Sequence, residues 1–179
     1  DVTWHGPGQV VGYPLVSAPT RRGGGMADTV AYVRSVEQLL IDALGDLELE
    51  ARRRAEYPGV WLGDDRTGLR KVAAIGVRLR RGRAMHGFAL NVDPDLSWFD
   101  AIVPCGIADA GVTSLAAEGC DASMHEVVDV ITERAAALWG SGTVDRADVV
   151  WRHRPGDLSA FSRGVGAGSA IDSAAAVDA

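Results

Sequence analysis

Residues 71–92, KVAAIGVRLRRGRAMHGFALNV, decide the fold class of this chain. They read as two strands, Lys71–Leu79 and Met85–Val92, joined by the basic turn Arg80–Arg83. A parallel crossover needs about a dozen residues or more, so this much shorter connection predicts that the two strands pair antiparallel. The stretch therefore predicts a β-hairpin.

Three further strands are expected before the hairpin. Val10–Val16 is apolar enough for a mostly buried strand, whereas Leu47–Arg53 alternates apolar and charged residues as a half-exposed strand does. Gly59–Leu62 reads as a short strand, and the loop Gly63–Gly68 that follows it is typical of a hairpin connection.

Two amphipathic helices complete the pattern. The first begins at Asp28 or Thr29, either of which can cap it, and ends at Gly45. The second begins at Ser123, which has the spacing of a capping box with Glu126. Hairpin-paired strands with separate helices predict an α+β domain. The expected apolar faces are Val30, Val33, Val36, Leu40 and Leu44 in the first helix, and Val127, Ile131, Ala135 and Leu138 in the second.

The composition indicates one globular domain followed by a tail. The chain has 179 residues, of which 47% are apolar, enough to form a buried core. Beyond Trp151 the residues are mostly Gly, Ala, Ser and Asp. A domain is therefore expected over residues 1–151 and a disordered tail over residues 152–179.

Charge and hydropathy exclude several classes of function. The 24 acidic and 18 basic residues leave a net charge of −6, and the longest basic run is the triplet Arg52–Arg54, which argues against binding to nucleic acid or a membrane surface. No apolar run approaches the roughly 20 residues of a membrane span. Two cysteines cannot form a disulfide-stapled scaffold, so a reducing, cytoplasmic setting is expected.

One lysine and one cysteine are candidates for chemistry. Lys71 is the single lysine beside 17 arginines, and arginine cannot replace lysine where a proton must be released near neutral pH. Lys71 is either such a group or a solvated charge at a strand end. Cys105 stands between proline and glycine, and is either an accessible nucleophile or a buried structural cysteine. Cys120 has acidic neighbours that disfavour a thiolate and is expected to be a bystander.

The histidines and glycines give weaker signals. His5 and His86 each precede a glycine, which leaves the backbone accessible to a ligand, and each is either a ligand-binding or a structural residue. No pair of His, Cys or carboxylate residues has the spacing of metal ligands. The glycine-rich segments match neither a P-loop nor a dinucleotide-binding fingerprint, so no metal and no nucleotide cofactor is expected.

Four segments, in this order, resemble the lipoyl(octanoyl) transferase family. Each segment alone is a weak signal, whereas the ordered set, with Cys105 34 residues after Lys71, is a specific one. The resemblance covers about residues 1–115. The segments are Thr3–Pro14 (TWHGPGQVVGYP), Lys71–Gly76 (KVAAIG), His86–Val92 (HGFALNV), and Pro104–Ile107 (PCGI) with Val112–Leu115 (VTSL).

The resemblance implies a fold and an activity. The fold is that of the biotin and lipoate protein ligase catalytic domain, with a mixed, largely antiparallel sheet and packed helices. The activity is transfer of an octanoyl group from acyl carrier protein to a lysine of a lipoyl domain, without a cofactor. The acceptors would be the lipoyl domains of 2-oxoacid dehydrogenases and the glycine cleavage H protein.

The resemblance also assigns roles to residues. Cys105 would carry the acyl group as a thioester, and Lys71 would lower the pKa of that thiol and move its proton. The residues that would line the acyl-binding pocket are Thr3, Trp4, His5, Ala74, Ile75, Gly76, His86, Gly87, Phe88 and Ala89.

The chain departs from the family pattern in one respect, and two other functions stay open. The family has an Arg-Gly-Gly segment before the position of Asp1, so a fragment of a longer protein is expected. One alternative is a Cys–His thioesterase or amidase that uses Cys105 and His86. The other is a catalytically inactive module that binds a carrier protein. The arginines at positions 78, 80, 81 and 83 are either its docking patch or an exposed hairpin end that carries charge. A lipoate or biotin ligase would need a Gly-rich nucleotide loop at His5–Gln9.

Overall fold

The structure is a computed structural model, and it describes residues 3–21, 24–55, 57–64, 66–101, 111–140 and 143–149. The chain forms two compact units, Asp1–Val144 and Asp145–Ala179. The predicted tail, residues 152–179, lies outside the described residues. All helices and strands below belong to the first unit. They are β1 (Gln9–Gly12), α1 (Thr29–Asp46), β2 (Val60–Leu62), β3 (Arg70–Arg80), β4 (Arg83–Asn91), the 3₁₀-helix η1 (Leu96–Ala101), β5 (Gly111–Val112), the 3₁₀-helix η3 (Ala116–Glu118) and α2 (Met124–Trp139).

The strands form one sheet whose pairing is mostly antiparallel. Its order is β1-β4-β3-β2, and β5 adds a parallel pairing with β3. The β3–β4 pairing runs from Ala73 opposite Leu90 to Arg80 opposite Arg83, which confirms the predicted hairpin. β2 also pairs antiparallel with β3, as the loop between them predicts. The predicted fold class, an α+β domain with a mixed, largely antiparallel sheet, is confirmed.

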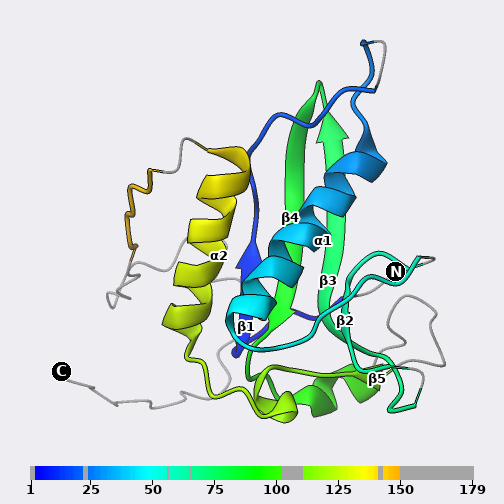
Figure 1. Ribbon diagram of the computed structural model, residues 1–179, viewed down its shortest axis with the longest axis vertical. Coiled ribbons are helices and arrows are strands. Elements are labelled where there is room, and N and C mark those ends of the chain that lie inside the picture. Colours follow the sequence, from blue (N-terminus) through cyan, green and yellow to red (C-terminus); the bar gives the residue numbers. More distant parts are fainter. Residues whose placement is uncertain are drawn as a thin grey trace, which may run out of the picture. The chain divides into compact units, whose positions relative to one another are not determined.

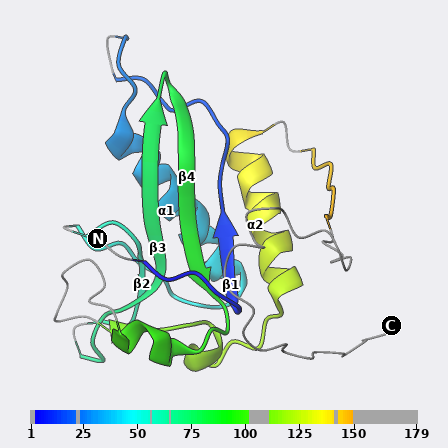
Figure 2. The same cartoon turned by 180° about the vertical axis from the view of Figure 1, so that it is seen from behind.

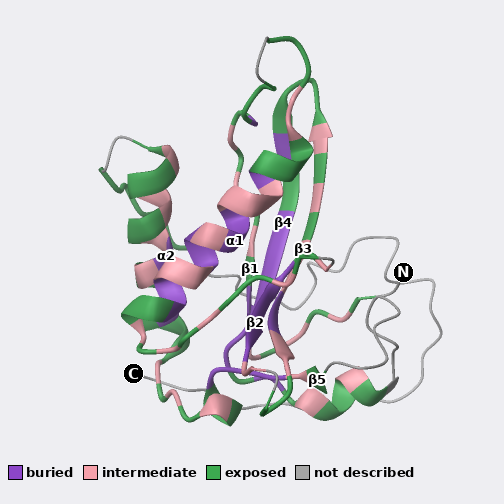
Figure 3. Cartoon of the chain, turned by 45° about the vertical axis from the view of Figure 1, so that its right-hand side comes forward, coloured by how far each residue is buried: buried purple, intermediate pink, exposed green. Residues whose placement is uncertain are grey.

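Both α-helices lie on the same face of the sheet (Figure 1), and the view from behind shows no described helix over the other face (Figure 2). α1 contacts β2 and β3, and α2 contacts α1 and β1. Burial is concentrated where α1 meets the sheet and decreases toward the end of the β3–β4 hairpin (Figure 3). The largest fully buried apolar side chains are Trp61, Tyr32, Leu39, Leu40, Leu44, Leu90, Leu115, Val36, Val60, Val72 and Val127.

Local side-chain hydrogen bonds begin both helices as predicted. The Asp28 carboxylate accepts from the Ala31 backbone N–H of α1 at 3.0 Å. In α2, the Ser123 hydroxyl accepts from the Glu126 N–H, and the Glu126 carboxylate accepts from the Ser123 N–H, which completes the capping box. None of the helices in the described part of the chain is both long enough and apolar enough to cross a bilayer.

The predicted apolar faces of the two helices are wrong at one end each. Val30 is 67% exposed and Leu138 is 45% exposed. In their place, Tyr32 of α1 and Trp139 of α2 meet between the helices, with ring centroids 6.2 Å apart. Large aromatic rings bury more apolar surface than valine or leucine, so this pair contributes to the packing between the helices.

Two of the predicted strands are also corrected. Leu47–Arg53 forms no strand, and its only bridge joins Arg52 to Trp61. Glu48 has a φ of 63°, which interrupts an extended backbone, and Arg53 forms an ion pair with the buried carboxylate of Glu37. The strand predicted over Val10–Val16 ends at Gly12, and it is half exposed because no described helix covers its outer face.

Candidate active site

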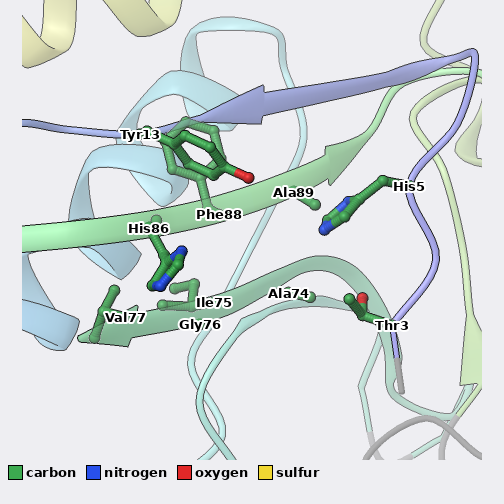
Figure 4. Close-up of a pocket in the computed structure, with 11 residues that line it drawn as sticks. Thr3, His5, Tyr13, Ala74, Ile75, Gly76, Val77, His86, Phe88 and Ala89 are labelled. Carbon is green, nitrogen blue, oxygen red and sulfur yellow. The ribbon is translucent and has the colours of Figure 1, made fainter. Parts of the chain in front are cut away.

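A groove of about 400 Å³ lies over the middle of β3 and β4. Figure 4 shows Thr3 and His5 at one end, beside Ala74 and Ala89, with the side chains of Tyr13 and His86 toward the other end. Its lining residues are Thr3, His5, Tyr13, Ala74, Ile75, Gly76, Val77, His86, Gly87, Phe88 and Ala89.

The floor of the groove consists of small residues in two cross-strand rows. Ala74 lies opposite Ala89, and Gly76 lies opposite Gly87. Directly opposite residues of an antiparallel pair present their side chains on the same face, so neither row carries a side chain larger than a methyl group. A Cβ on Gly76 would meet no atom within 4 Å. The rows therefore leave an apolar channel that is open along the sheet.

Gly87 also allows β1 to approach β4 beside the groove. A Cβ built on Gly87 would lie 2.0 Å from the Gly12 carbonyl oxygen. Only a residue without a side chain permits this backbone contact. The residue after β1, Tyr13, meets the ring of His86 edge-to-face, with centroids 6.3 Å apart. His86 itself has a φ of 62°, a conformation rare for residues other than glycine.

Nine of the ten residues predicted for the acyl pocket line this groove; the exception is Trp4. The Trp4 ring stacks on Trp98 of η1 at 6.3 Å and meets Phe99 edge-on at 5.4 Å. Tyr13 and Val77 also line the groove and were not predicted to do so. Tyr13 lies inside the strand predicted over Val10–Val16 as mostly buried, and its exposure was not evident from its apolar neighbours.

Lys71 lies near the start of β3, three residues before the first floor residue, Ala74. A bulge in the β2–β3 pairing sets Trp61 opposite Lys71, and the Lys71 Nζ lies 4.7 Å from the centroid of the buried Trp61 ring. A Cβ on Gly59 would lie 3.2 Å from the Lys71 Cε. The lysine stem therefore packs beside a bare backbone, and its ammonium lies over an aromatic face.

Backbone pairing and a hydrogen-bonded carboxylate hold β5 and the residues after it beside Lys71. Val112 pairs with Lys71, and the Thr113 N–H donates to the Lys71 carbonyl at 3.0 Å. Arg70 donates from Nε and Nη2 to the two Glu118 oxygens at 2.7 and 2.9 Å, and the Thr113 hydroxyl donates to Glu118 at 2.6 Å. The Arg70 guanidinium and the Thr113 hydroxyl hold the pKa of Glu118 below its usual value of 4.5.

A second polar chain runs from Thr113, the residue after β5, to the groove. The Asn91 Nδ2 donates to the Thr113 carbonyl at 2.9 Å, and the Gln9 Nε2 donates to the Asn91 Oδ1 at 2.8 Å. At the groove, the Gln9 Oε1 lies 3.2 Å from the His5 Nδ1. Thr113, whose N–H binds the Lys71 carbonyl, is thus connected to the ring of His5 through the side chains of Asn91 and Gln9.

The turn at Pro7 and Gly8 places His5 beside Gln9. Gly8 has a φ of 85°, and a Cβ there would lie 2.2 Å from the Asp93 carbonyl oxygen. The N–H groups of Val92 and Asp93 donate to the Gly8 carbonyl at 3.0 Å each, which joins the turn to the end of β4. The HGPGQ segment therefore folds as a clamped turn that presents one histidine to the groove.

The sequence model of the lipoyl protein ligase A/B catalytic domain matches residues 1–136, which include every groove residue and Lys71. The chain belongs to this family. Similar members are named octanoyltransferase. The one from Salinispora tropica is 58% identical over 139 residues, which are 76% of this chain and 63% of that protein. The one from Salinispora arenicola is 51% identical over 142 residues, 78% of this chain and 64% of that protein.

The chain spans about three-fifths of the length of these curated relatives. The octanoyltransferase of Thermobifida fusca, 47% identical over 150 residues, likewise matches 81% of this chain and 61% of its own length. The resemblance predicted from the four segments is therefore confirmed at the level of the family.

Solved structures confirm the ligase-like fold of this lipoyl protein ligase A/B domain. A bipartite lipoate protein ligase from Thermoplasma acidophilum aligns with a TM-score of 0.60 at 18% identity, over 75% of this chain and 52% of that chain. A biotin protein ligase from Aquifex aeolicus in complex with biotin and ATP aligns with a TM-score of 0.51 at 16% identity, over 73% of this chain and 50% of that chain.

The predicted nucleophile, Cys105, lies outside the described residues. The described residues on either side of it are Ala101, the last residue of η1, and Gly111, the first residue of β5, which pairs with Arg70. Cys120 is a half-buried free thiol packed against the hydrophobic core. Among the described residues, no three His, Cys, Asp or Glu side chains gather in a way that would hold a metal ion.

Proposed function

We propose that this domain is an octanoyltransferase, which moves an eight-carbon acyl group from acyl carrier protein to a lysine of a lipoyl domain. The groove is the observation that carries the proposal. Its apolar floor of Ala74, Gly76, Gly87 and Ala89 begins three residues after Lys71 on the same strand. From Ala74 to Val77 the floor covers three residues of strand, which span about 10 Å. An extended acyl chain therefore fits along it, with its carbonyl toward Lys71 and its methyl end toward Val77.

In the first proposed step, the acyl group moves to the Cys105 thiol. Lys71 takes the thiol proton, the Cys105 thiolate attacks the thioester carbonyl of the donor, and the carrier's thiolate leaves with the proton that Lys71 returns. One thioester is broken and one is formed, so the step needs no ATP. The ammonium position beside Trp61 and the pairing of Lys71 with Val112 support Lys71 in this role.

In the second proposed step, the amine of the acceptor lysine attacks the Cys105 thioester. The amine loses one proton to Lys71, the amide bond forms, and the departing Cys105 thiolate recovers that proton. The amide is more stable than the thioester, which drives the transfer. The neutral form of Lys71 is thus regenerated at the end of each step.

The partners in this proposal are proteins. The donor is octanoyl-loaded acyl carrier protein, and the acceptors are the lipoyl domains of 2-oxoacid dehydrogenases and the glycine cleavage H protein, in the cytoplasm. The similarity to proteins named octanoyltransferase supports this assignment. The four arginines expected to bind a carrier protein, Arg78, Arg80, Arg81 and Arg83, are all exposed.

Incubation with octanoyl-loaded acyl carrier protein tests the proposal. Intact-mass measurement is expected to show one octanoyl group on the protein, located on Cys105 by peptide mapping. Cys105→Ser is expected to abolish the adduct and Lys71→Met to slow its formation, whereas the control Cys120→Ser leaves it unchanged. Absence of any adduct on the wild-type protein refutes the proposal, and binding without an adduct favours the inactive carrier-binding module.

The same measurement distinguishes the octanoyltransferase from the alternative Cys–His thioesterase or amidase. His86 lies opposite Val77, six residues and about 20 Å of strand beyond Lys71. His86→Ala is therefore expected to acylate at close to the wild-type rate. Loss of acylation in His86→Ala together with normal acylation in Lys71→Met would favour the hydrolase instead.

A further inference from the structure

The polar chain from Thr113 to the groove determines which nitrogen of a neutral His5 ring carries the hydrogen. We infer that His5 is a catalytic residue whose unprotonated Nε2 accepts a hydrogen bond from the attacking amine of the acceptor lysine. This role rests on the proposed octanoyl transfer, whereas the tautomer of the neutral ring follows from the hydrogen bonds alone. The argument begins at Asn91 and proceeds outward to the groove.

Asn91 has only one possible amide orientation. It is 4% exposed, and its closest polar partner on one side is the Thr113 backbone carbonyl at 2.9 Å. A carbonyl oxygen only accepts hydrogen bonds, so the NH₂ group of Asn91 must face Thr113. The Asn91 oxygen then faces Gln9, and at 2.8 Å it must accept from the Gln9 NH₂ group.

The orientation of Gln9 sets the tautomer of His5. With its NH₂ group bound to Asn91, Gln9 turns its Oε1 to the His5 Nδ1 at 3.2 Å. Two acceptors cannot form a hydrogen bond, so Nδ1 must carry a hydrogen and donate it to Gln9. In the neutral imidazole the other nitrogen, Nε2, is then an acceptor with a free lone pair.

The position of the ring directs the Nε2 lone pair into the groove, where it can accept a hydrogen bond. His5 lines the groove, and Figure 4 shows the far end of its ring directed toward the floor between Ala74 and Ala89. This is the end of the floor nearest Lys71, where the acyl carbonyl lies in the proposed function. An attacking amine has two N–H bonds. Lys71 removes one proton, and a hydrogen bond from the other N–H to Nε2 orients the nitrogen lone pair toward the carbonyl.

The tautomer is tested by NMR, independently of activity. The ¹⁵N shifts of the His5 ring, recorded at the alkaline end of a pH series, are expected to show a protonated Nδ1 and an unprotonated Nε2. Gln9→Met removes the acceptor and is expected to populate the other tautomer. The control Gln38→Met removes a glutamine hydrogen bond to Asp42 on α1 and is expected to leave His5 unchanged. A wild-type ring protonated on Nε2 overturns the inference.

The catalytic role is tested on the second step alone, with the Cys105 thioester preformed. His5→Asn keeps an N–H near the position of Nδ1 but has no group at Nε2, and is expected to slow transfer from the preformed thioester to lysine 10- to 100-fold. His5→Gln restores an acceptor near Nε2 and is expected to recover part of the rate. His125→Asn on α2 is the matched control. Equal rates in wild type and His5→Asn, or equal losses in both His5 variants, overturn the role.

The outcomes distinguish this inference from the proposed function. If the wild-type protein takes no octanoyl group, the proposed function fails and the NMR result on the tautomer still stands. If the wild-type protein transfers octanoate and His5→Asn transfers it equally fast, only the role of His5 fails.

Discussion

Replacing Glu118 by glutamine is expected to destabilise the domain by about 2 kcal/mol at neutral pH. The carboxylate accepts two hydrogen bonds from the Arg70 guanidinium and one from the Thr113 hydroxyl. A buried hydrogen bond to a charged group contributes about 1.5–3 kcal/mol, and an exposed ion pair about 0.2–1 kcal/mol. The Arg70 and Glu118 side chains are 31% and 19% exposed, between these limits. The two Arg70 bonds together are therefore assigned about 1 kcal/mol and the Thr113 bond about 1 kcal/mol.

The effect has a definite dependence on pH. The hydrogen bond from Arg70, followed by that from Thr113, lowers the pKa of Glu118 in the folded protein. A carboxyl group with a lowered folded pKa contributes stability above its unfolded pKa, and this contribution is lost as the pH falls through the folded pKa. The difference between wild type and Glu118→Gln is therefore expected to be complete at pH 7, to decrease below about pH 4.5, and to disappear at lower pH.

Urea unfolding followed by tryptophan fluorescence measures this difference at each pH. The expected 2 kcal/mol corresponds to a melting temperature lower by about 4–8 °C for a domain of this size. Glu133→Gln, at an exposed position of α2, is the control and is expected to change stability by less than about 0.5 kcal/mol. A Glu118→Gln variant as stable as that control at pH 7, or a difference that grows as the pH falls, refutes the reasoning.

Three further predictions concern the groove, the lysine and a helix cap. Gly76→Val is expected to keep the melting temperature, because a Cβ there meets no atom within 4 Å, and to reduce octanoyl loading more than tenfold by filling the channel. Gly87→Ala is the comparison: its Cβ would lie 2.0 Å from a backbone oxygen, so it is expected to lower the melting temperature. Gly59 has a φ of 139°, and a Cβ there would lie 2.8 Å from the Ala73 oxygen and 3.2 Å from the Lys71 Cε. Gly59→Ala is therefore expected to displace Lys71 and to slow acylation measured by intact mass. Ser123→Ala is expected to cost about 1 kcal/mol in urea unfolding through loss of the capping box.

Local patterns predicted the elements that depend on neighbouring residues. The β3–β4 hairpin follows from two apolar runs and a short turn, and the starts of α1 and α2 follow from Asp28 and the Ser123–Glu126 pair. In each case the groups that make the structure lie within a few residues of one another. Such interactions act before distant segments meet, so the sequence indicates them directly.

Contacts between distant segments decided the features that local patterns predicted wrongly. The alternation in Leu47–Arg53 predicted a strand, but Glu37 lies 16 residues before Arg53 and binds it through a buried carboxylate. The apolar stripe of α1 placed Val30 inward, but Trp139 of α2 packs on Tyr32 instead. Neither partner is visible from the pattern of the segment itself.

The sequence alone determined the α+β class, the hairpin, the helix starts and, through four ordered segments, the family and nine of the residues that line the groove. Their contact with an acyl chain, and the roles of Lys71 and Cys105, stay predictions. Only the tertiary structure decided that Lys71 faces Trp61, that Gly87 lets β1 approach β4, and that Asn91 and Gln9 join His5 to Thr113. The physical reason is that a hydrogen bond or a close backbone contact needs two partners at one place, and the partners of Asn91 and Lys71 come from segments far apart in the chain.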